Sequence, residues 1–252
     1  FFQVKLLPFL PFQKKRHSKA ELQCLKFSDT VITTSPSLTK KYSRINENSY
    51  TVFNGFDSFV KTKDLNKFLL MYSGVMKSIQ NPKNLWKVLE EIALENKIFF
   101  KDLKVRLIGD FDNEIKNELN GKLIESKVEF EKYLEKEKLD KEISMARILI
   151  LSSVNLDSVN DIIPGKLYYY FSFKRPILAF SNIHSDVSEI IKETNTGRVF
   201  DFSNKIDLKN HILELYNNYK LGINNYNPEG INNYTFDTLS NQIIKILKKT
   251  IN

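Results

Sequence analysis

The sequence predicts an α/β fold: a doubly wound parallel sheet of about six strands, preceded by part of a second, smaller α/β domain. From residue 68 onward, short apolar runs rich in β-branched residues alternate with longer segments of helical period. Repeated strand and helix units of this kind form parallel sheets through right-handed crossovers. A shorter stretch before residue 58 repeats the same alternation.

The apolar runs of the larger unit are its expected strands. They are residues 68–74, 105–110, 128–134, 148–153, 176–181 and 197–202. Helices are expected at residues 82–96, 186–194 and 207–219. The first of these helices carries an apolar stripe behind Pro82, and proline suits the first turn of a helix.

The smaller unit is expected within residues 1–57. A helix at 18–27, a strand at 30–35, a helix from Pro36 and a strand at 50–54 follow one another there. The predicted organisation has four parts. They are a partial domain at 1–57, a polar linker at 58–67, a larger domain at 68–234 and a C-terminal segment at 235–252 with a helix at 236–249.

Composition excludes several classes of protein. The single cysteine, Cys24, excludes a disulfide framework and a multi-cysteine zinc site, and the three histidines are too scattered to hold a metal. No two of the eight glycines stand two residues apart, so the chain lacks a G-x-G-x-x-G fingerprint, and it also lacks a P-loop and a G-x-S-x-G elbow. We therefore expect no metal, no cofactor and a reducing, cytoplasmic setting.

The formal charge of +8 is concentrated at the start of the chain, where residues 1–20 hold five basic residues and no acid. The remaining excess is too small for a nucleic-acid surface. Residues 1–12 are apolar, but they are too few to span a bilayer and are broken by Pro8 and Pro11. This stretch either packs against chain that precedes Phe1 or makes peripheral contact with the inner face of the cytoplasmic membrane.

Ligands of doubly wound sheets bind beyond the carboxyl ends of the strands, and three segments of this sequence fall there. In residues 74–83, Gly74 permits close backbone approach while Lys77 and Lys83 supply charge for phosphate oxygens; the alternative is a solvated loop. In residues 133–136, Tyr133 and Leu134 offer backbone groups to a flat ring.

The third segment, residues 161–170, is the most informative. Pro164 and Gly165 begin a helix, so the free backbone amides from Gly165 to Leu167 suit a diphosphate, and Lys166 adds charge beside them. The alternative reading is an ordinary helix start.

Stretches spread over nearly the whole chain carry a family resemblance. They are SDTVITTSPSL (28–38), YTVFNGFD (50–57), LLMYSGVMKSIQNPKNLWKVL (69–89), VRLIGDFD (105–112), ARILIL (146–151), DIIPGKLYYYFSFKRPILAF (161–180) and EIIKETNTGRVF (189–200). Their order and spacing resemble family 4 of the retaining glycosyltransferases. Members of that family have a GT-B fold of two facing Rossmann-like domains and use nucleotide-sugar donors without a catalytic metal.

The resemblance implies a hexosyltransferase-type enzyme of polysaccharide or cell-surface glycan synthesis. It would move a sugar from a nucleotide-diphosphate sugar to a glycan or lipid-linked acceptor. Residues 1–57 would belong to the acceptor-side domain, residues 68–234 would bind the donor, and the last helix would return towards the first domain. The implied catalytic residue is Asp161, which orients the sugar hydroxyls. The implied substrate-binding residues are Gly74, Lys77, Lys83, Tyr133, Leu134, Pro164, Gly165, Lys166, Leu167 and Tyr169.

Three positions depart from the family pattern. Tyr169 stands where the family has a second carboxylate that accepts from both ribose hydroxyls, and Val75 and Gln80 replace two usual phosphate partners. Each lost charged hydrogen bond would weaken donor binding roughly tenfold or more. The alternatives are therefore a degenerate, non-catalytic GT-B protein with a binding or scaffolding role, and a sugar-nucleotide epimerase on the same fold.

Overall fold

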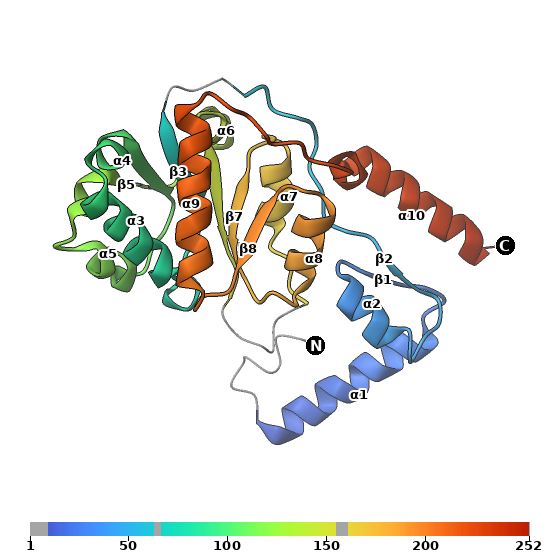
Figure 1. Ribbon diagram of the computed structural model, residues 1–252. Coiled ribbons are helices and arrows are strands. Elements are labelled where there is room, and N and C mark those ends of the chain that lie inside the picture. Colours follow the sequence, from blue (N-terminus) through green and yellow to red (C-terminus); the bar gives the residue numbers. More distant parts are fainter. Residues whose placement is uncertain (1–9, 63–66, 155–160, 252) are drawn as a thin grey trace.

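The computed structural model describes residues 10–62, 67–154 and 161–251. Its larger part is a six-stranded parallel sheet in the order β5-β4-β3-β6-β7-β8 (Figure 1). Counted from the first strand of this sheet, the order is third, second, first, fourth, fifth, sixth, as in Rossmann-type doubly wound sheets. The predicted fold class is confirmed.

Each expected strand of this sheet is present. The strands are β3 (Phe68–Ser73), β4 (Leu103–Ile108), β5 (Val128–Glu131), β6 (Ile148–Ser152), β7 (Ile177–Phe180) and β8 (Gly197–Phe200). The central strands β3 and β6 are buried along their whole length. Both faces of a parallel sheet are covered by helices, which is why these strands read as continuous apolar runs.

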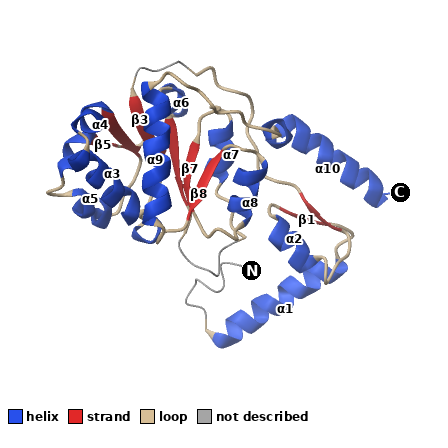
Figure 2. Ribbon diagram, in the orientation of Figure 1, coloured by secondary structure: helices blue, strands red, loops and turns tan. Residues whose placement is uncertain are grey.

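Helices cover both faces of the sheet (Figure 2). One face packs against α3 (Lys83–Glu95), α4 (Lys97–Asp102), α5 (Asn113–Leu119) and α9 (Lys205–Lys220). The other face packs against α6 (Lys136–Ser144), α7 (Gly165–Phe171) and α8 (Asp186–Glu193). Short 3-10 turns occur at Ser78–Gln80, Leu123–Lys127 and Ile231–Tyr234.

The smaller unit contains a two-stranded parallel sheet. Its elements are α1 (Pro11–Phe27), β1 (Val31–Thr33), α2 (Pro36–Tyr42) and β2 (Ser49–Thr51). Helix α1 begins seven residues earlier than expected, at Pro11, because proline is well placed in the first turn and nothing after it breaks the helix. The C-terminal helix α10 (Phe236–Ile251) buries Leu239 and Ile246 against Val52 of this unit.

The chain passes between the two units twice, and the two crossings are hydrogen-bonded to each other. The backbone N–H of Phe56 donates to the carbonyl of Tyr234 at 3.0 Å, and the N–H of Phe236 donates to the carbonyl of Phe56 at 2.9 Å. The Tyr168 ring of α7 packs against the Tyr234 ring at this seam, with 5.5 Å between the centroids.

A second contact joins α2 to α8. The backbone N–H and the hydroxyl of Ser37 donate to the two carboxylate oxygens of Asp186, at 3.2 and 2.6 Å, and only 3% of Asp186 is exposed. None of the helices in the described part of the chain combines the length and the apolar character needed to cross a bilayer.

Candidate functional site

The sheet changes its winding direction between β3 and β6. Helix α3, which follows β3, packs on one face, whereas α7, which follows β6, packs on the other. In doubly wound folds the carboxyl ends of two such strands border the crevice in which ligands bind. The residues around these two strand ends therefore form the candidate site.

Gly74 ends β3 and shapes the crevice. Its φ of +108° is a conformation that favours glycine, and a Cβ built on it would lie 3.1 Å from Nζ of Lys166. The neighbouring Gly109 has a φ of +133°, and a Cβ there would lie 2.2 Å from the carbonyl oxygen of Gly74. Because both glycines lack a side chain, the two loops touch and the Lys166 ammonium reaches the end of β3.

The Lys166 ammonium lies against an aromatic ring. Its Nζ is 3.6 Å from the centroid of the Tyr72 ring, and no carboxylate of the described residues pairs with it. Burial lowers the pKa of Lys166 to about 7, because a buried ammonium loses its hydration. The Tyr72 ring favours the charged form, since an ammonium is attracted to the negative face of an aromatic ring. Lys166 thus brings an amine to the end of β3 that no carboxylate of residues 10–62, 67–154 or 161–251 pairs with.

Lys77 and Lys83 are in a different situation. The ammonium of Lys77 lies 3.4 Å from Asp110 and 3.2 Å from Asp112, and the ammonium of Lys83 lies 2.7 Å from Glu114. These carboxylates raise the pKa of both lysines by hydrogen bonding to the charged form. Both lysines follow β3 as expected, but each is already paired with an acid from the β4 to α5 region.

Val75 and Gln80, which depart from the family pattern, make hydrogen bonds within the protein. The carbonyl of Val75 accepts a hydrogen bond from the Tyr72 hydroxyl at 2.6 Å, while the Val75 side chain is 51% exposed. The side-chain oxygen of Gln80 accepts from the N–H of Lys77 at 3.1 Å, and the Gln80 carbonyl accepts from the Ser152 hydroxyl at 2.5 Å. Gln80 therefore fastens the loop after β3 to the end of β6.

Two buried polar atoms near the crevice lack a hydrogen-bond partner within the described residues, and sequence reasoning missed both. They are Oγ of Ser153, directly after β6, and Nδ2 of Asn81, in the loop after β3. These residues are only 7% and 5% exposed. Because side chains alternate along a strand, Ser153 continues the α7 side of β6, the side that holds Leu149 and Leu151. Polar atoms buried without partners are rare in native proteins, and a bound ligand is one way to satisfy them. The serine pair that ends the run ILILSS could have signalled this.

Helix α7 begins at Gly165, with Pro164 before it, as the sequence indicates. A Cβ on Gly165 would meet no atom within 4 Å, so space is open at this point. Leu167 is fully buried, and its N–H donates to the carbonyl of Pro164 at 2.9 Å. The helix has seven residues, so its contribution to the site comes from Lys166 more than from its dipole.

The Tyr169 hydroxyl bonds to a carboxylate of the preceding helix, α6. It donates a hydrogen bond to Asp140 of α6, and Asp140 also pairs with the ammonium of Lys136 at 2.8 Å. Burial and this hydrogen bond raise the pKa of Tyr169, so it stays neutral. Position 169 thus lacks a carboxylate, but Asp140 lies one hydrogen bond away.

The remaining predicted residues are Tyr133, Leu134 and Asp161. Tyr133 is 82% exposed on the loop after β5, and Leu134 is packed against the core on the α7 side. Asp161 is half-buried. It lies near Tyr42 of α2, as its charge contributes to the raised pKa of Tyr42, although burial and the Glu21 hydrogen bond contribute more. The structure brings Gly74 and Lys166 together.

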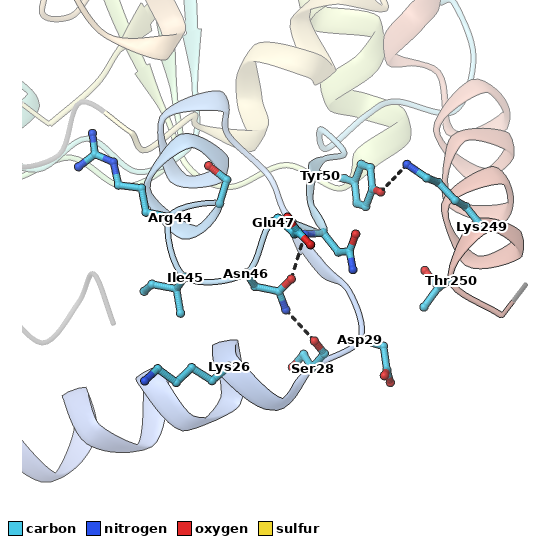
Figure 3. A pocket seen from close by; sticks show the side chains of 12 residues that line it. Lys26, Ser28, Asp29, Arg44, Ile45, Asn46, Glu47, Tyr50, Lys249 and Thr250 are labelled. Carbon is cyan, nitrogen blue, oxygen red and sulfur yellow. Dashed lines mark hydrogen bonds between the residues drawn. The ribbon is translucent and has the colours of Figure 1, made fainter.

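A hollow of about 690 Å³ lies in the smaller unit (Figure 3). It is lined by the end of α1, the loop between α2 and β2, and the end of α10. Asn46 holds this loop by donating to the carbonyls of Leu25 and Ser28 at 2.9 and 2.6 Å, and Lys249 donates to the Tyr50 hydroxyl at 3.1 Å. This hollow belongs to elements other than those around the β3 and β6 ends.

A family model for glycosyl transferases group 1 matches residues 54–227, which is more than half of the chain. The chain belongs to the group 1 glycosyltransferases. A comparison with curated proteins gives no match.

Solved structures of glycosyltransferases share the fold. A variant of TarM from S. aureus, in complex with fondaparinux, alpha-GlcNAc-glycerol and UDP, superimposes with a TM-score of 0.65 at 16% identity, over 92% of this chain and 46% of TarM. Sucrose-phosphate synthase from Thermosynechococcus elongatus gives 0.66 at 14% identity, over 94% and 62%. The pneumococcal O-GlcNAc transferase GtfA, in complex with UDP and GlcNAc, gives 0.65 at 11% identity, over 91% and 47%. The chain therefore spans about half the length of TarM and GtfA.

Proposed function

We propose that this chain is the donor-binding part of a retaining glycosyltransferase. Its donor is a nucleotide-diphosphate sugar, and its acceptor is a glycan or a lipid-linked glycan. The observation that carries the proposal is the Lys166 ammonium, which lies against Tyr72 near the end of β3 and pairs with no carboxylate in the part of the chain that the structure describes. An ammonium without a carboxylate at the ligand edge of a doubly wound sheet suits a diphosphate.

In the proposed mechanism, the chain stabilises the departing diphosphate by electrostatics. The Lys166 ammonium and the Ser153 hydroxyl donate to phosphate oxygens, and Gly74 lets the phosphates approach the backbone. The charge on the diphosphate grows as the bond to the sugar breaks, so a fixed cation stabilises that stage more than the bound donor. Asp161, which faces the smaller unit, accepts hydrogen bonds from the sugar hydroxyls and orients the sugar.

Ribose recognition is assigned to the α6 side of the crevice. Asp140, fixed by the Tyr169 hydroxyl, supplies the carboxylate that position 169 lacks. A carboxylate oxygen has lone pairs left for hydroxyl donors after it accepts from a phenol. Tyr133 and Leu134 border the place where the base would then lie.

Binding of nucleoside diphosphates to the full chain tests the proposal. Isothermal titration calorimetry with UDP, GDP and ADP is expected to show binding by at least one of them. Replacing Lys166 by methionine should weaken that binding at least tenfold, since a charged hydrogen bond is worth about 1.5–3 kcal/mol. The matched control is Lys127→Met. The Lys127 ammonium also lies over an aromatic ring, 4.4 Å from the centroid of Phe100. Lys127 directly precedes β5, however, so it lies at the amino ends of the strands and not at their carboxyl ends. Equal affinities of the Lys166 variant and the wild type would refute the assignment.

A non-catalytic binding or scaffolding protein is the second candidate. It is favoured by Val75, Gln80 and Tyr169, which lack the charges of the family pattern. A ligand at 100 times its dissociation constant stabilises a protein by about 2.7 kcal/mol. If no nucleoside diphosphate raises the melting temperature at millimolar concentration, this second function gains over the first.

Peripheral membrane contact on the cytoplasmic face is proposed for the start of α1. Lys14, Lys15, Arg16 and Lys19 lie on this helix, and Phe12 is 66% exposed beside them. Basic residues next to exposed aromatics bind anionic headgroups. Cosedimentation with phosphatidylglycerol vesicles should fall when the four basic residues become glutamine. It should persist when the control set on and after α4 is changed: Lys97, Lys101 and Lys104.

A further inference from the structure

Helices α2 and α8 join the two units of the chain at the carboxyl ends of their strands. Helix α2 follows β1 and α8 follows β7, and both strands belong to parallel sheets. Ser37, in the first turn of α2, donates its N–H and its hydroxyl to the carboxylate of Asp186, the first residue of α8 (Figure 1). Ligands of doubly wound sheets bind at the carboxyl ends of the strands. The Ser37–Asp186 contact therefore joins the ligand edges of the two units.

Each partner of this contact is fixed by its own unit. The hydroxyl of Ser35 caps α2, and the hydroxyl of Ser185 caps α8, by accepting a hydrogen bond from a backbone N–H of the first turn. Next to Asp186, Val187 anchors α8 in the core of the larger unit. Groups that are already fixed lose little conformational freedom when they bind each other. The contact can therefore form and break without refolding either unit.

The contact is polar, whereas apolar packing between the units is found at the two crossings. Helix α2 buries none of its residues, and Ser37 itself is exposed. At the crossings, the ring of Phe53 packs against the rings of Tyr168 and Tyr234. Units of one chain move relative to each other unless they share a large apolar interface. When the units separate at α2, water can replace Ser37 as the hydrogen-bond donor to Asp186.

We propose that the Ser37–Asp186 contact is a reversible closure, which holds the ligand edges of the two units together in the chain on its own. Breaking the contact lets the units rotate about the crossings at Phe56 and Tyr234, which stay joined by backbone hydrogen bonds. Such a rotation changes the distance between the two ligand edges and preserves the fold of each unit. The inference concerns the chain without any ligand, so it does not depend on the proposed function.

Distances between two spin labels on the full chain test the proposal. One label is attached to Cys24, which is exposed on α1 in the smaller unit. The second is attached to Asn117→Cys, at an exposed position of α5 in the larger unit. Cys24 is the single cysteine of the chain, so the two labels occupy defined positions. With Ser37 intact, double electron–electron resonance should give one narrow distribution of distances.

Variants of Ser37 weaken the contact in steps. Ser37→Ala removes the hydroxyl donor, so the ratio of open to closed molecules should rise about tenfold or more, because a hydrogen bond to a charged group is lost. Ser37→Glu places a second carboxylate beside Asp186, and repulsion should make the open population the major one. Glutamate is favourable in the first turn of a helix, so α2 is retained. Ser37→Thr keeps the hydroxyl and should restore the narrow distribution.

Ser43→Glu is the matched control for the added charge. Ser43 lies at the other end of α2, where its hydroxyl donates to the carbonyl of Lys40, and this variant should give the distribution of the wild type. A wild-type distribution in both Ser37→Ala and Ser37→Glu would overturn the proposal, as would a broad distribution in the wild type itself. No nucleotide is present in these measurements, so either result leaves the proposed function standing.

Discussion

Replacing Lys166 by methionine should make the protein more stable while it loses its ligand. Burial lowers the pKa of Lys166 from 10.5 to about 7, which means that folding disfavours the ammonium. At pH 7 this shift corresponds to about 4 kcal/mol of lost stability. The attraction between the ammonium and the Tyr72 ring returns about 1–2 kcal/mol. Because methionine keeps most of the apolar stem, the variant should gain about 2 kcal/mol.

The gain should depend on pH in a direction that the pKa shift fixes. Between pH 7 and 10.5 the unfolded chain binds more protons at Lys166 than the folded chain does, so the stability of the wild type rises with pH. The advantage of the variant is therefore full below pH 7 and shrinks to less than about 1 kcal/mol at pH 10. Urea denaturation at pH 7 and at pH 10 measures it, with Lys127→Met as the control, since Lys127 is half-buried and also lies over an aromatic ring. A variant that is less stable than the wild type at pH 7, or whose gain is the same at both pH values, would refute the reasoning.

Further substitutions probe the loops, the contact between the units and the acid range. Gly109→Ala should cost about 3 kcal/mol or more, because its Cβ would lie 2.2 Å from the Gly74 carbonyl; a loss below 1 kcal/mol in urea denaturation would contradict this. Ser37→Ala should cost about 1–3 kcal/mol, since buried Asp186 loses a donor; an unchanged thermal midpoint would speak against it. Burial would raise the pKa of Asp102, but donors on α9 outweigh it and hold this pKa low. Asp102→Asn should therefore destabilise by about 1 kcal/mol at pH 7 and by nothing at pH 2, as acid denaturation curves would reveal.

The strands could be predicted because each is an apolar run that the sheet buries on both faces. Helices α4, α5 and α6 could not, because they have six, seven and nine residues and much of their surface is charged. Short helices of that composition are stabilised by tertiary packing, for example by buried Phe99 in α4, and a local pattern does not contain this information.

The strand ends that Lys77 and Lys166 follow could be predicted, but the ion pairing of these lysines could not. Sequence order places Lys77 and Lys166 near strand ends, because parallel strands share a carboxyl edge. Whether each lysine has a counter-ion depends on residues far along the chain: Asp112 stands 35 positions after Lys77. The Ser153 hydroxyl, which finds no partner among the described residues, depends likewise on what the fold places around it.

The paired crossings at Phe56 and Tyr234 limit how the two units can move. A single connecting segment would allow swivelling in every direction, whereas two segments bonded side by side leave one line about which bending is easy. Gly55 sets how closely they lie, because a Cβ there would come within 2.4 Å of the Tyr234 carbonyl. Relative motion of the two units would then be a rotation about the axis through these two segments. The hydrogen bonds between Ser37 and Asp186 would have to break for the units to separate.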